Sequence, residues 1–322
     1  MGITDKIFKI KDNNEFNDIA LQIFHFQATN VSVYKEYIKL LNINTNNITS
    51  ICDIPFLPIQ FFKSKNIISN NDIAQKIFKS SSTTGQNRSY HLLKDIELYK
   101  KSFLASFNTF YGNIEDYIVL ALLPSYLEQG DSSLIYMVDK LIKLSNNKQS
   151  SFVTNENIIE KSIEINKQQK VILIGVSYAL LELTNEIELD LSSWIVIETG
   201  GMKGRGKELI RDELHLQLSK GLNLEKIHSE YSMTELLSQA YSKGDGVFYC
   251  PSWMKVVIRE FDDPLSVCGF KKTGGVNIID LANYYSCSFI ATQDLGRYYE
   301  DASFEILGRF DNSNVRGCNL LV

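Results

Sequence analysis

The segment VILIG, residues 171–175, is an unbroken run of aliphatic side chains that ends in glycine. An apolar run of this length, rich in β-branched residues, is typical of a strand buried on both faces of a sheet. Ser177 follows it and can begin a helix as its N-cap. Two further runs, YIVLALL at 117–123 and WIVI at 194–197, have the same character, and helical patterns separate the three. This alternation predicts an α/β fold with a mostly parallel sheet covered by helices.

The two ends of the chain have different patterns. Residues 15–41 carry apolar side chains at helical spacing, which predicts a helical N-terminal segment. In the last third, short apolar runs such as MKVVIRE (254–260) and VNIID (276–280) alternate with turn residues, which predicts a C-terminal antiparallel β subdomain. We therefore expect three regions: a helical segment at 1–78 packed on the main domain, an α/β core at 79–245, and a β-rich subdomain at 246–322.

The composition excludes several classes of function. The chain of 322 residues has a formal net charge of −5 and no basic block, so nucleic acid is not an expected partner. Its longest apolar runs, 117–127 and 171–183, are too short to span a bilayer, and we expect a cytoplasmic protein with no membrane span. The five cysteines lie far apart without a C-x-x-C motif, which argues against a disulfide framework and a structural zinc site.

Two polar or glycine-rich segments allow more than one interpretation. KSSSTTGQNRS, at 79–89, is either a flexible polar linker or a loop that holds phosphate. GGMKGRGKE, at 200–208, nearly matches the P-loop pattern G-x-x-x-x-G-K-[ST]. Glu208, however, stands where a P-loop has the Ser or Thr that binds magnesium, and its charge would repel phosphate. A sharp strand-to-helix turn, or a turn that lines a pocket for another ligand, is the better interpretation.

Two later segments carry residues that could contact a nucleotide. In EYSMTE, at 230–235, the ring of Tyr231 can stack on a base, Thr234 can bond phosphate and Glu235 can bind magnesium. The same segment could simply be an acidic first turn of a helix. Asp294 follows a strand and could accept two ribose hydroxyls, and Arg309 could bind phosphate. Each of these two residues, taken singly, also fits an ordinary β-turn.

The order of these motifs along the chain resembles the adenylate-forming superfamily, whose members activate carboxylic acids with ATP. The chain is most similar to the LuxE family, the acyl-protein synthetases of the bacterial luminescence fatty-acid reductase, which are related to phenylacetate–CoA ligases. The resemblance implies the fold of the large N-terminal domain of these enzymes, without their mobile C-terminal lid. It covers most of the chain from residue 80 onward, in the segments SSSTTGQNRSYH (80–91), LLPSYLEQGDSSLIYM (122–137), ETGGMKGRGKELIRDELH (198–215), SEYSMTELLSQAYS (229–242), IIDLANYYSCSFIATQDLG (278–296) and LGRFDNSNVRGCNLL (307–321).

The resemblance makes residues 79–89 a phosphate loop within the α/β core. The loop residues that match the family pattern are Ser80, Ser81, Thr83, Thr84 and Gly85, with Arg88 in the place of a lysine. The sequence departs from the pattern at Ser82, where the family has glycine, and at Asn87, where it has proline. Because a non-glycine residue at positive φ is strained, Ser82 would cost about 1 kcal/mol if the loop keeps its shape.

The resemblance also implies roles for the later residues. Tyr231 would stack on adenine, Thr234 would contact the α-phosphate and Glu235 would hold Mg²⁺. Asp294 would bind the ribose hydroxyls and Arg309 would lie beside ribose or phosphate. The turn at Gly200 and Gly201 would form a wall of the pocket.

The implied reaction has two steps, with ATP and Mg²⁺ as cofactors. The carboxylate of an acid, expected to be a fatty acid, attacks the α-phosphate of ATP to give an acyl-adenylate, and the acyl group then passes to a thiol. In LuxE-like proteins the acyl group ends on a cysteine near the C-terminus, and Cys318 fits that place. CoA or a carrier protein is the alternative acceptor, and a reductase or carrier protein is a possible partner. Two other functions stay open: an ATP-independent acyltransferase that takes its acyl group from CoA or a carrier protein, and a non-catalytic subunit of a biosynthetic complex.

Overall fold

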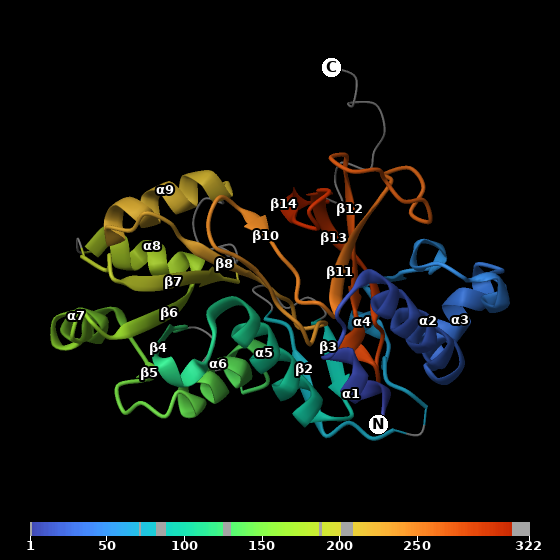
Figure 1. Cartoon of the computed structure of the whole chain (residues 1–322), viewed down its shortest axis with the longest axis horizontal. Helices are drawn as coiled ribbons and strands as arrows, with labels where there is room; N and C mark the ends of the chain where they lie inside the picture. Colours follow the sequence, from blue (N-terminus) through green and yellow to red (C-terminus); the bar gives the residue numbers. More distant parts are fainter. Residues whose placement is uncertain are drawn as a thin grey trace, which may run out of the picture.

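A computed structural model of the chain describes residues 2–70, 72–81, 88–124, 130–186, 189–200 and 209–310. In this part of the chain two six-stranded sheets lie side by side, with helices around them (Figure 1). The fold is mixed α/β, as the sequence predicts. None of the helices in these ranges is long and apolar enough to cross a membrane.

One sheet has the strand order β5-β4-β6-β7-β8-β9, and its first five strands are mutually parallel. All six residues of β4 and six of the seven in β6 are buried, which explains the unbroken apolar runs of the sequence. Only β9 runs antiparallel to its neighbour. The strands are β4 (Tyr117–Leu122), β5 (Ser151–Phe152), β6 (Lys170–Val176), β7 (Trp194–Thr199), β8 (His228–Tyr231) and β9 (Ala240–Ser242).

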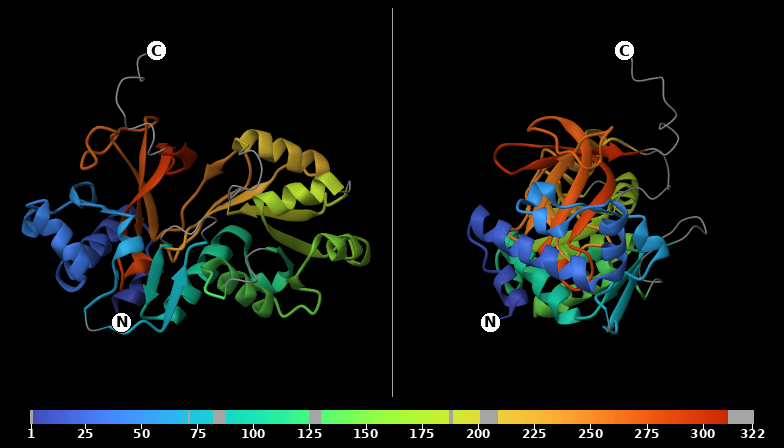
Figure 2. Two further views of the ribbon diagram at one scale, coloured as in Figure 1. Left: turned by 180° about the vertical axis from the view of Figure 1, so that it is seen from behind. Right: turned by 90° about the vertical axis from the view of Figure 1, so that its right-hand side faces the viewer.

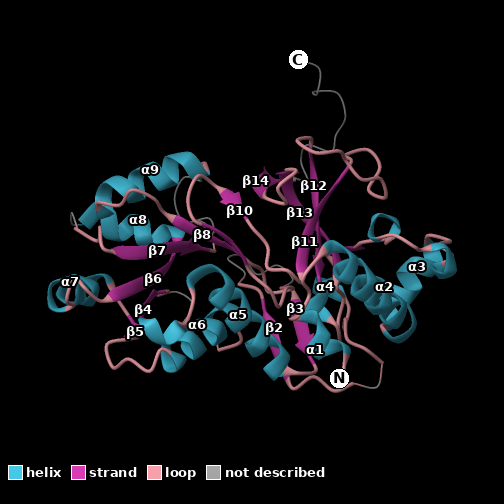
Figure 3. Cartoon of the chain, in the orientation of Figure 1, coloured by secondary structure: helices cyan, strands magenta, loops and turns pink. Residues whose placement is uncertain are grey.

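Helices connect these strands and cover both faces of the parallel sheet (Figure 3). Ser177 is the first residue of the helix that follows β6, at the place that the sequence predicts for a helix start. Asp95 caps another of the helices by accepting hydrogen bonds from the amides of Glu97 and Leu98. The five helices are α5 (Ile96–Tyr111), α6 (Ser133–Leu144), α7 (Asn155–Glu164), α8 (Ser177–Glu186) and α9 (Arg211–Leu222).

The second sheet has the order β10-β14-β13-β12-β11 and is antiparallel along this path, and β1 adds to β13 in parallel. It contains the longest strands of the described chain, β12 and β13, so the expectation that the main sheet is mostly parallel is wrong. Buried and partly exposed residues alternate along β13, so Asp294, which was expected to follow a strand or to lie in a β-turn, continues the strand. The strands are β1 (Leu57–Pro58), β10 (Val247–Phe248), β11 (Met254–Arg259), β12 (Thr273–Asp280), β13 (Phe289–Tyr298) and β14 (Phe304–Arg309).

The N-terminal helices lie beside the antiparallel sheet, most of whose strands come from the last third of the sequence (Figure 2). Phe24 packs edge-on against Phe289 of β13, and Gln27 is fully buried. The amide of Gln27 donates to the carbonyls of Asn283 and Tyr284, and its oxygen accepts from the amide of Ser288. The helices are α1 (Ile3–Ile7), α2 (Asn13–Asn30), α3 (Ser32–Leu40) and α4 (Phe61–Ser64), and short 3₁₀ turns occur at Thr45–Asn47, Ile51–Asp53, Ile114–Asp116 and Leu281–Asn283.

A small hairpin of β2 (Lys76–Lys79) and β3 (Tyr90–Leu93) lies between the two sheets (Figure 1). The Lys79 ammonium is 2.8 Å from the Asp131 carboxylate, which ties the hairpin to the start of the α6 region. The tip of the hairpin carries residues 82–87, which the structure does not describe. The division of the chain at residues 79 and 246 stays a prediction.

We expect the Gln27→Leu substitution to lower the free energy of unfolding by about 2–4 kcal/mol, because it leaves buried donor and acceptor groups without partners. Gln22→Leu in the same helix changes an exposed side chain and should have little effect. Urea unfolding of the two variants measures the difference. Equal stability of both variants would contradict the assigned role of Gln27 in joining α2 to the sheet.

Candidate functional site

The side chains of Asp294 and Tyr231 form a hydrogen bond where the two sheets meet. Tyr231 ends β8 of the parallel sheet, and its hydroxyl donates to Asp294 Oδ2 over 2.7 Å. Arg309 lies opposite Asp294 in the register of β13 and β14, and its Nε donates to Asp294 Oδ1 over 3.1 Å. Three residues whose neighbours in the sequence are 63 and 15 positions apart therefore form one cluster.

The three side chains of this cluster differ in their exposure. The Asp294 side chain is 8% exposed, whereas that of Arg309 is 79% exposed. Burial, and then the neighbouring Asp294 carboxylate, raise the pKa of Tyr231 well above its usual value, so Tyr231 is a neutral donor. An ionised carboxylate has about four acceptor positions, and these two bonds occupy two of them. Asp294 can therefore accept two more donors, such as the hydroxyls of a ribose.

The ring of Tyr231 is enclosed by aromatic side chains from the antiparallel sheet. It contacts Phe248 and Phe304 edge-on, at centroid distances of 6.0 and 5.6 Å, and Tyr231 is 9% exposed. Edge-on aromatic packing of this kind adds to the stabilisation from buried area. The predicted stacking of Tyr231 on adenine stays a prediction.

Glu235 lies between the hairpin and the antiparallel sheet. The Ser89 side chain is its hydrogen-bond partner, and Asn283 donates to its backbone carbonyl over 2.8 Å. Burial raises the pKa of Glu235, while Ser89 and the charges of Arg309 and Lys63 oppose this increase. A buried carboxylate in this state is suited to bind a cation, because a cation would favour its ionised form.

The segment that follows Glu235 is fixed by a second buried carboxylate. Asp280 is fully buried and accepts from the amides of Leu237 and Ser238, the Ser238 hydroxyl and the amide of Ala282. Trp253 also donates to the Ser238 hydroxyl over 2.9 Å. Fully satisfied polar networks of this kind hold a segment in one conformation.

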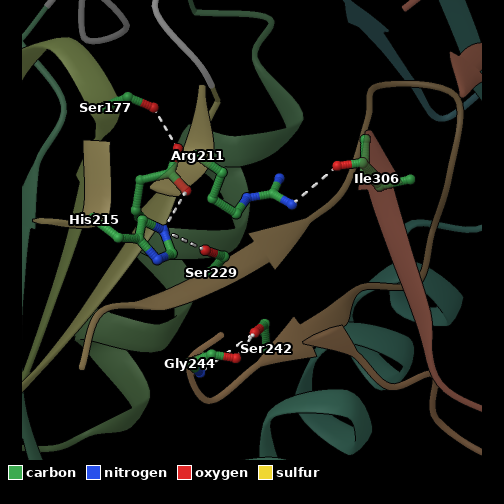
Figure 4. Close-up of polar contacts among 8 residues, drawn as sticks. Ser177, Arg211, His215, Ser229, Ser242, Gly244 and Ile306 are labelled. Carbon is green, nitrogen blue, oxygen red and sulfur yellow. Dashed lines mark hydrogen bonds and ion pairs between the residues drawn. The ribbon is translucent and has the colours of Figure 1, made fainter. Parts of the chain in front are cut away.

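A third polar cluster lies at the carboxyl ends of β6 and β7 (Figure 4). Glu198 accepts a short hydrogen bond from Ser177, and His215 Nε2 lies 4.0 Å from Glu198 and 3.2 Å from the Ser229 hydroxyl. Burial opposes ionisation of Glu198, but hydrogen bonds from His215 and Ser177 and the charge of Arg211 outweigh it and lower its pKa. Because Glu198 and Ser229 both face Nε2, these groups do not form a nucleophile–base relay.

Two more contacts extend this cluster. Glu230, on the neighbouring strand, has a pKa raised by burial despite hydrogen bonds from Ser232, Tyr241 and Thr199. Arg211 reaches from α9 to the Ile306 carbonyl of β14 over 3.4 Å (Figure 4), which gives a second polar link between the sheets.

Gly200 follows β7 at φ +76°, a conformation that favours glycine and lets the chain turn sharply at the strand end.

The structure brings together part of the predicted set of residues. Tyr231, Asp294 and Arg309 are in direct contact, and Thr234 and Glu235 contact the stem of the hairpin. The carbonyl of Ser89 accepts from the amide of Ser80, so Ser80 lies in this stem, where Ser81 follows it. Arg88 is exposed near the tip, and Gly200 lies at the end of β7. Thr83, Thr84, Gly85, Gly201 and Cys318 lie outside the described residues.

Several residues that hold this site were not predicted from the sequence. Ser89 ends the polar loop and His91 follows it, but their partners Glu235 and Thr234 are more than 140 positions away. Arg259 donates to the carbonyls of Val276 and Thr292, which supports the strand that carries Asp294. Only the resemblance, whose first segment ends at His91, directed attention to this part of the hairpin.

One cavity in the described part of the chain lies away from this site. It has a volume of about 340 Å³ and is lined by Asp116, Ile118, Asn147, Gln168, Gln169 and Lys170. All but Asn147 lie at the amino ends of β4 and β6, whereas ligands of parallel sheets bind at the carboxyl ends. We assign no role to this cavity.

The fold is similar to those of 2-hydroxyisobutyryl-CoA ligase and of MatB. 2-Hydroxyisobutyryl-CoA ligase, in complex with 2-HIB-AMP and CoA in the thioesterification state, matches with a TM-score of 0.67 and 12% identity, over 94% of this chain and 70% of that chain. ATP-bound MatB from Rhodopseudomonas palustris matches with a TM-score of 0.54 and 15% identity, over 72% of this chain and 47% of that chain. This chain thus spans about half the length of MatB.

No protein-family model and no curated protein match the sequence. At 12–15% identity, the structural likeness establishes the fold alone.

We expect the buried His91 to make the protein less stable in acid. Burial lowers the pKa of His91 to about 4 from its ordinary value of 6.5. The unfolded chain therefore binds a proton that the folded chain does not, and stability that is present above pH 6.5 is lost as the pH falls towards 4. From pH 7 to pH 5 the wild type should lose about 2 kcal/mol more than the His91→Asn variant. Urea unfolding at the two pH values measures this, and equal losses would contradict a buried neutral imidazole.

Proposed function

We propose that this protein binds ATP with Mg²⁺ and uses it to activate a carboxylic acid as an acyl-adenylate, which then reacts with a thiol. The observation that carries the proposal is the cluster of Tyr231, Asp294 and Arg309 between the sheets. A carboxylate with unoccupied acceptor positions beside an exposed guanidinium suits a ribose and a phosphate. The similarity to 2-hydroxyisobutyryl-CoA ligase, a structure with acyl-AMP and CoA bound, supports the same type of reaction.

In the first step, a carboxylate oxygen of the acid attacks the α-phosphorus of ATP. The bond from this phosphorus to the bridging oxygen of pyrophosphate breaks, and pyrophosphate leaves with that electron pair. Glu235 would bind Mg²⁺, which enters with ATP and offsets the charge of the phosphates. One carboxylate suffices for this, because Mg²⁺ is usually held by one or two carboxylates together with substrate phosphates. No cluster of three or more potential metal ligands occurs within the described ranges, which agrees with an ion that the substrate brings.

In the second step, a thiolate attacks the acyl carbon and AMP leaves. We propose Cys318 as this thiol and a fatty acid as the acyl donor, on the resemblance to LuxE-like synthetases. Among the cysteines that the structure describes, burial raises the pKa of Cys250, Cys268 and Cys287, which disfavours their thiolates. Those three are therefore poor nucleophiles. CoA, the thiol in the 2-hydroxyisobutyryl-CoA ligase complex, is the alternative acceptor.

We expect the protein to catalyse acid-dependent exchange between ATP and pyrophosphate, measured with a panel of fatty, aryl and small acids in Mg²⁺. Glu235→Gln and Asp294→Asn should lower the exchange rate by about 100-fold, because the first removes the proposed ligand of Mg²⁺ and the second the proposed acceptor of the ribose hydroxyls. Glu115→Gln, which changes an exposed carboxylate at the far end of β4, is the matched control. No exchange by folded wild-type protein with any acid would overturn the proposed activation. Protection from heat by acyl-CoA but not by ATP would then favour the acyltransferase.

We expect Cys318→Ser to keep full exchange but to lose covalent labelling by a radioactive acid, because adenylation precedes acyl transfer. Cys52→Ser, which changes an exposed cysteine, should keep both activities. Labelling of the protein is measured after denaturation and should be released by hydroxylamine, which cleaves thioesters. Label that persists in Cys318→Ser would contradict transfer to this cysteine.

A further inference from the structure

His91 lies between the three segments that carry the candidate site. It is in β3 of the hairpin and is 1% exposed. Its Nδ1 is 2.8 Å from the carbonyl oxygen of Thr234, and its Nε2 is 3.0 Å from the hydroxyl of Ser286 in the connection between β12 and β13. The ring of Phe62 contacts it edge-on at 5.6 Å. One side chain thus bonds both to the segment after β8 and to the antiparallel sheet.

The partners of His91 determine its tautomer. A carbonyl oxygen can only accept a hydrogen bond, so Nδ1 carries the proton and donates to Thr234. The other nitrogen, Nε2, then accepts from the hydroxyl of Ser286. The low pKa of the buried imidazole agrees with this neutral form. Each ring nitrogen thus has a defined hydrogen-bond partner. A substituted side chain that reproduces only one of the two hydrogen bonds tests the other contact separately.

Thr234, whose carbonyl is bonded to His91, directly precedes Glu235 in the chain. His91 holds the carbonyl of Thr234, and Asn283 holds the carbonyl of Glu235, so two successive peptide groups are fixed. On the hairpin side, the amide of Ser89 donates to the Ser80 hydroxyl over 2.9 Å, which closes the base of the polar loop two residues before His91. His91 therefore couples the base of the loop to the backbone of Thr234 and Glu235.

We propose that His91 is a positioning residue for adenylation: its Nδ1–H bond to Thr234 sets the place of Thr234 and Glu235 relative to the β2–β3 hairpin. The inference rests on the proposed function, in which Thr234 and Glu235 act on the phosphates of ATP and its Mg²⁺. His91 itself is 1% exposed, so its proposed effect passes through the backbone that it holds. A small misplacement of groups around a reacting phosphate can cost a large factor in rate.

The test uses two substitutions that each keep one half of the imidazole. The amide nitrogen of His91→Asn can take the place of Nδ1 and donate to Thr234, whereas the amide oxygen of His91→Gln can take the place of Nε2 and accept from the Ser286 hydroxyl. We expect His91→Gln to lower the kcat of ATP–pyrophosphate exchange by about 10-fold or more, with little change in the KM of the acid. His91→Asn should restore most of the rate. His25→Gln, an exposed histidine of α2, is the control.

A merely structural role gives a different result. In that case the loss of kcat would follow the loss of melting temperature in both variants, and the Asn variant would not rescue the rate. Equal kcat in His91→Asn and His91→Gln, after correction for the folded fraction, would overturn the proposal.

A second measurement tests the contact without any substrate. Hydrogen–deuterium exchange of the peptide that contains residues 233–237 should become faster in His91→Gln and stay close to wild type in His91→Asn. Unchanged protection in both variants would overturn the assigned contact. If wild-type protein shows no ATP–pyrophosphate exchange, the proposed function fails, while this measurement still decides whether His91 holds Thr234.

Discussion

The carboxylate of Asp294 joins the two sheets, and the candidate site is arranged around it. It accepts the Tyr231 hydroxyl from one sheet and the Arg309 guanidinium from its own, while its side chain is almost fully buried. A buried charge is stable only when hydrogen bonds and a nearby cation replace the water that it loses. Because these groups come from different sheets, the condition that stabilises the carboxylate also fixes the sheets relative to each other at this point.

The surrounding polar groups follow the same rule. Asp280 is compensated by four donors, and Glu198 by Ser177, His215 and Arg211. Glu235 has fewer direct partners: the Ser89 hydroxyl is the side chain that bonds to its carboxylate, and burial raises its pKa, as it does for Asp280. The group that we propose to bind Mg²⁺ thus has a side chain with few hydrogen bonds, while His91 and Asn283 hold the carbonyls of Thr234 and Glu235. A rigid backbone with an incompletely neutralised carboxylate is suited to receive a charged substrate without rearrangement.

Local patterns predicted much of the fold. The buried strands β4, β6 and β7 follow from apolar runs, and the start of α8 follows from Ser177. The length of β13 could not be predicted from local patterns, because Thr292 and Asp294 resemble turn residues until their partners are known. Tyr231, Asp294 and Arg309 were predicted through motif order, whereas His91 was missed because its bond to Thr234 spans 143 positions and leaves no periodic signal. The role of Cys318 stays a prediction from the resemblance.

We propose that Asp294 binds the ribose of ATP between the two sheets. Titration of wild-type protein and the Asp294→Asn variant with Mg²⁺ and either ATP or 2′,3′-dideoxy-ATP tests it directly by calorimetry. The account predicts that removal of both ribose hydroxyls weakens binding to wild type by about 10-fold or more, and changes binding to Asp294→Asn far less, because the two changes remove the same hydrogen bonds. Equal weakening in both proteins, or no binding of ATP to folded wild type, would contradict the account.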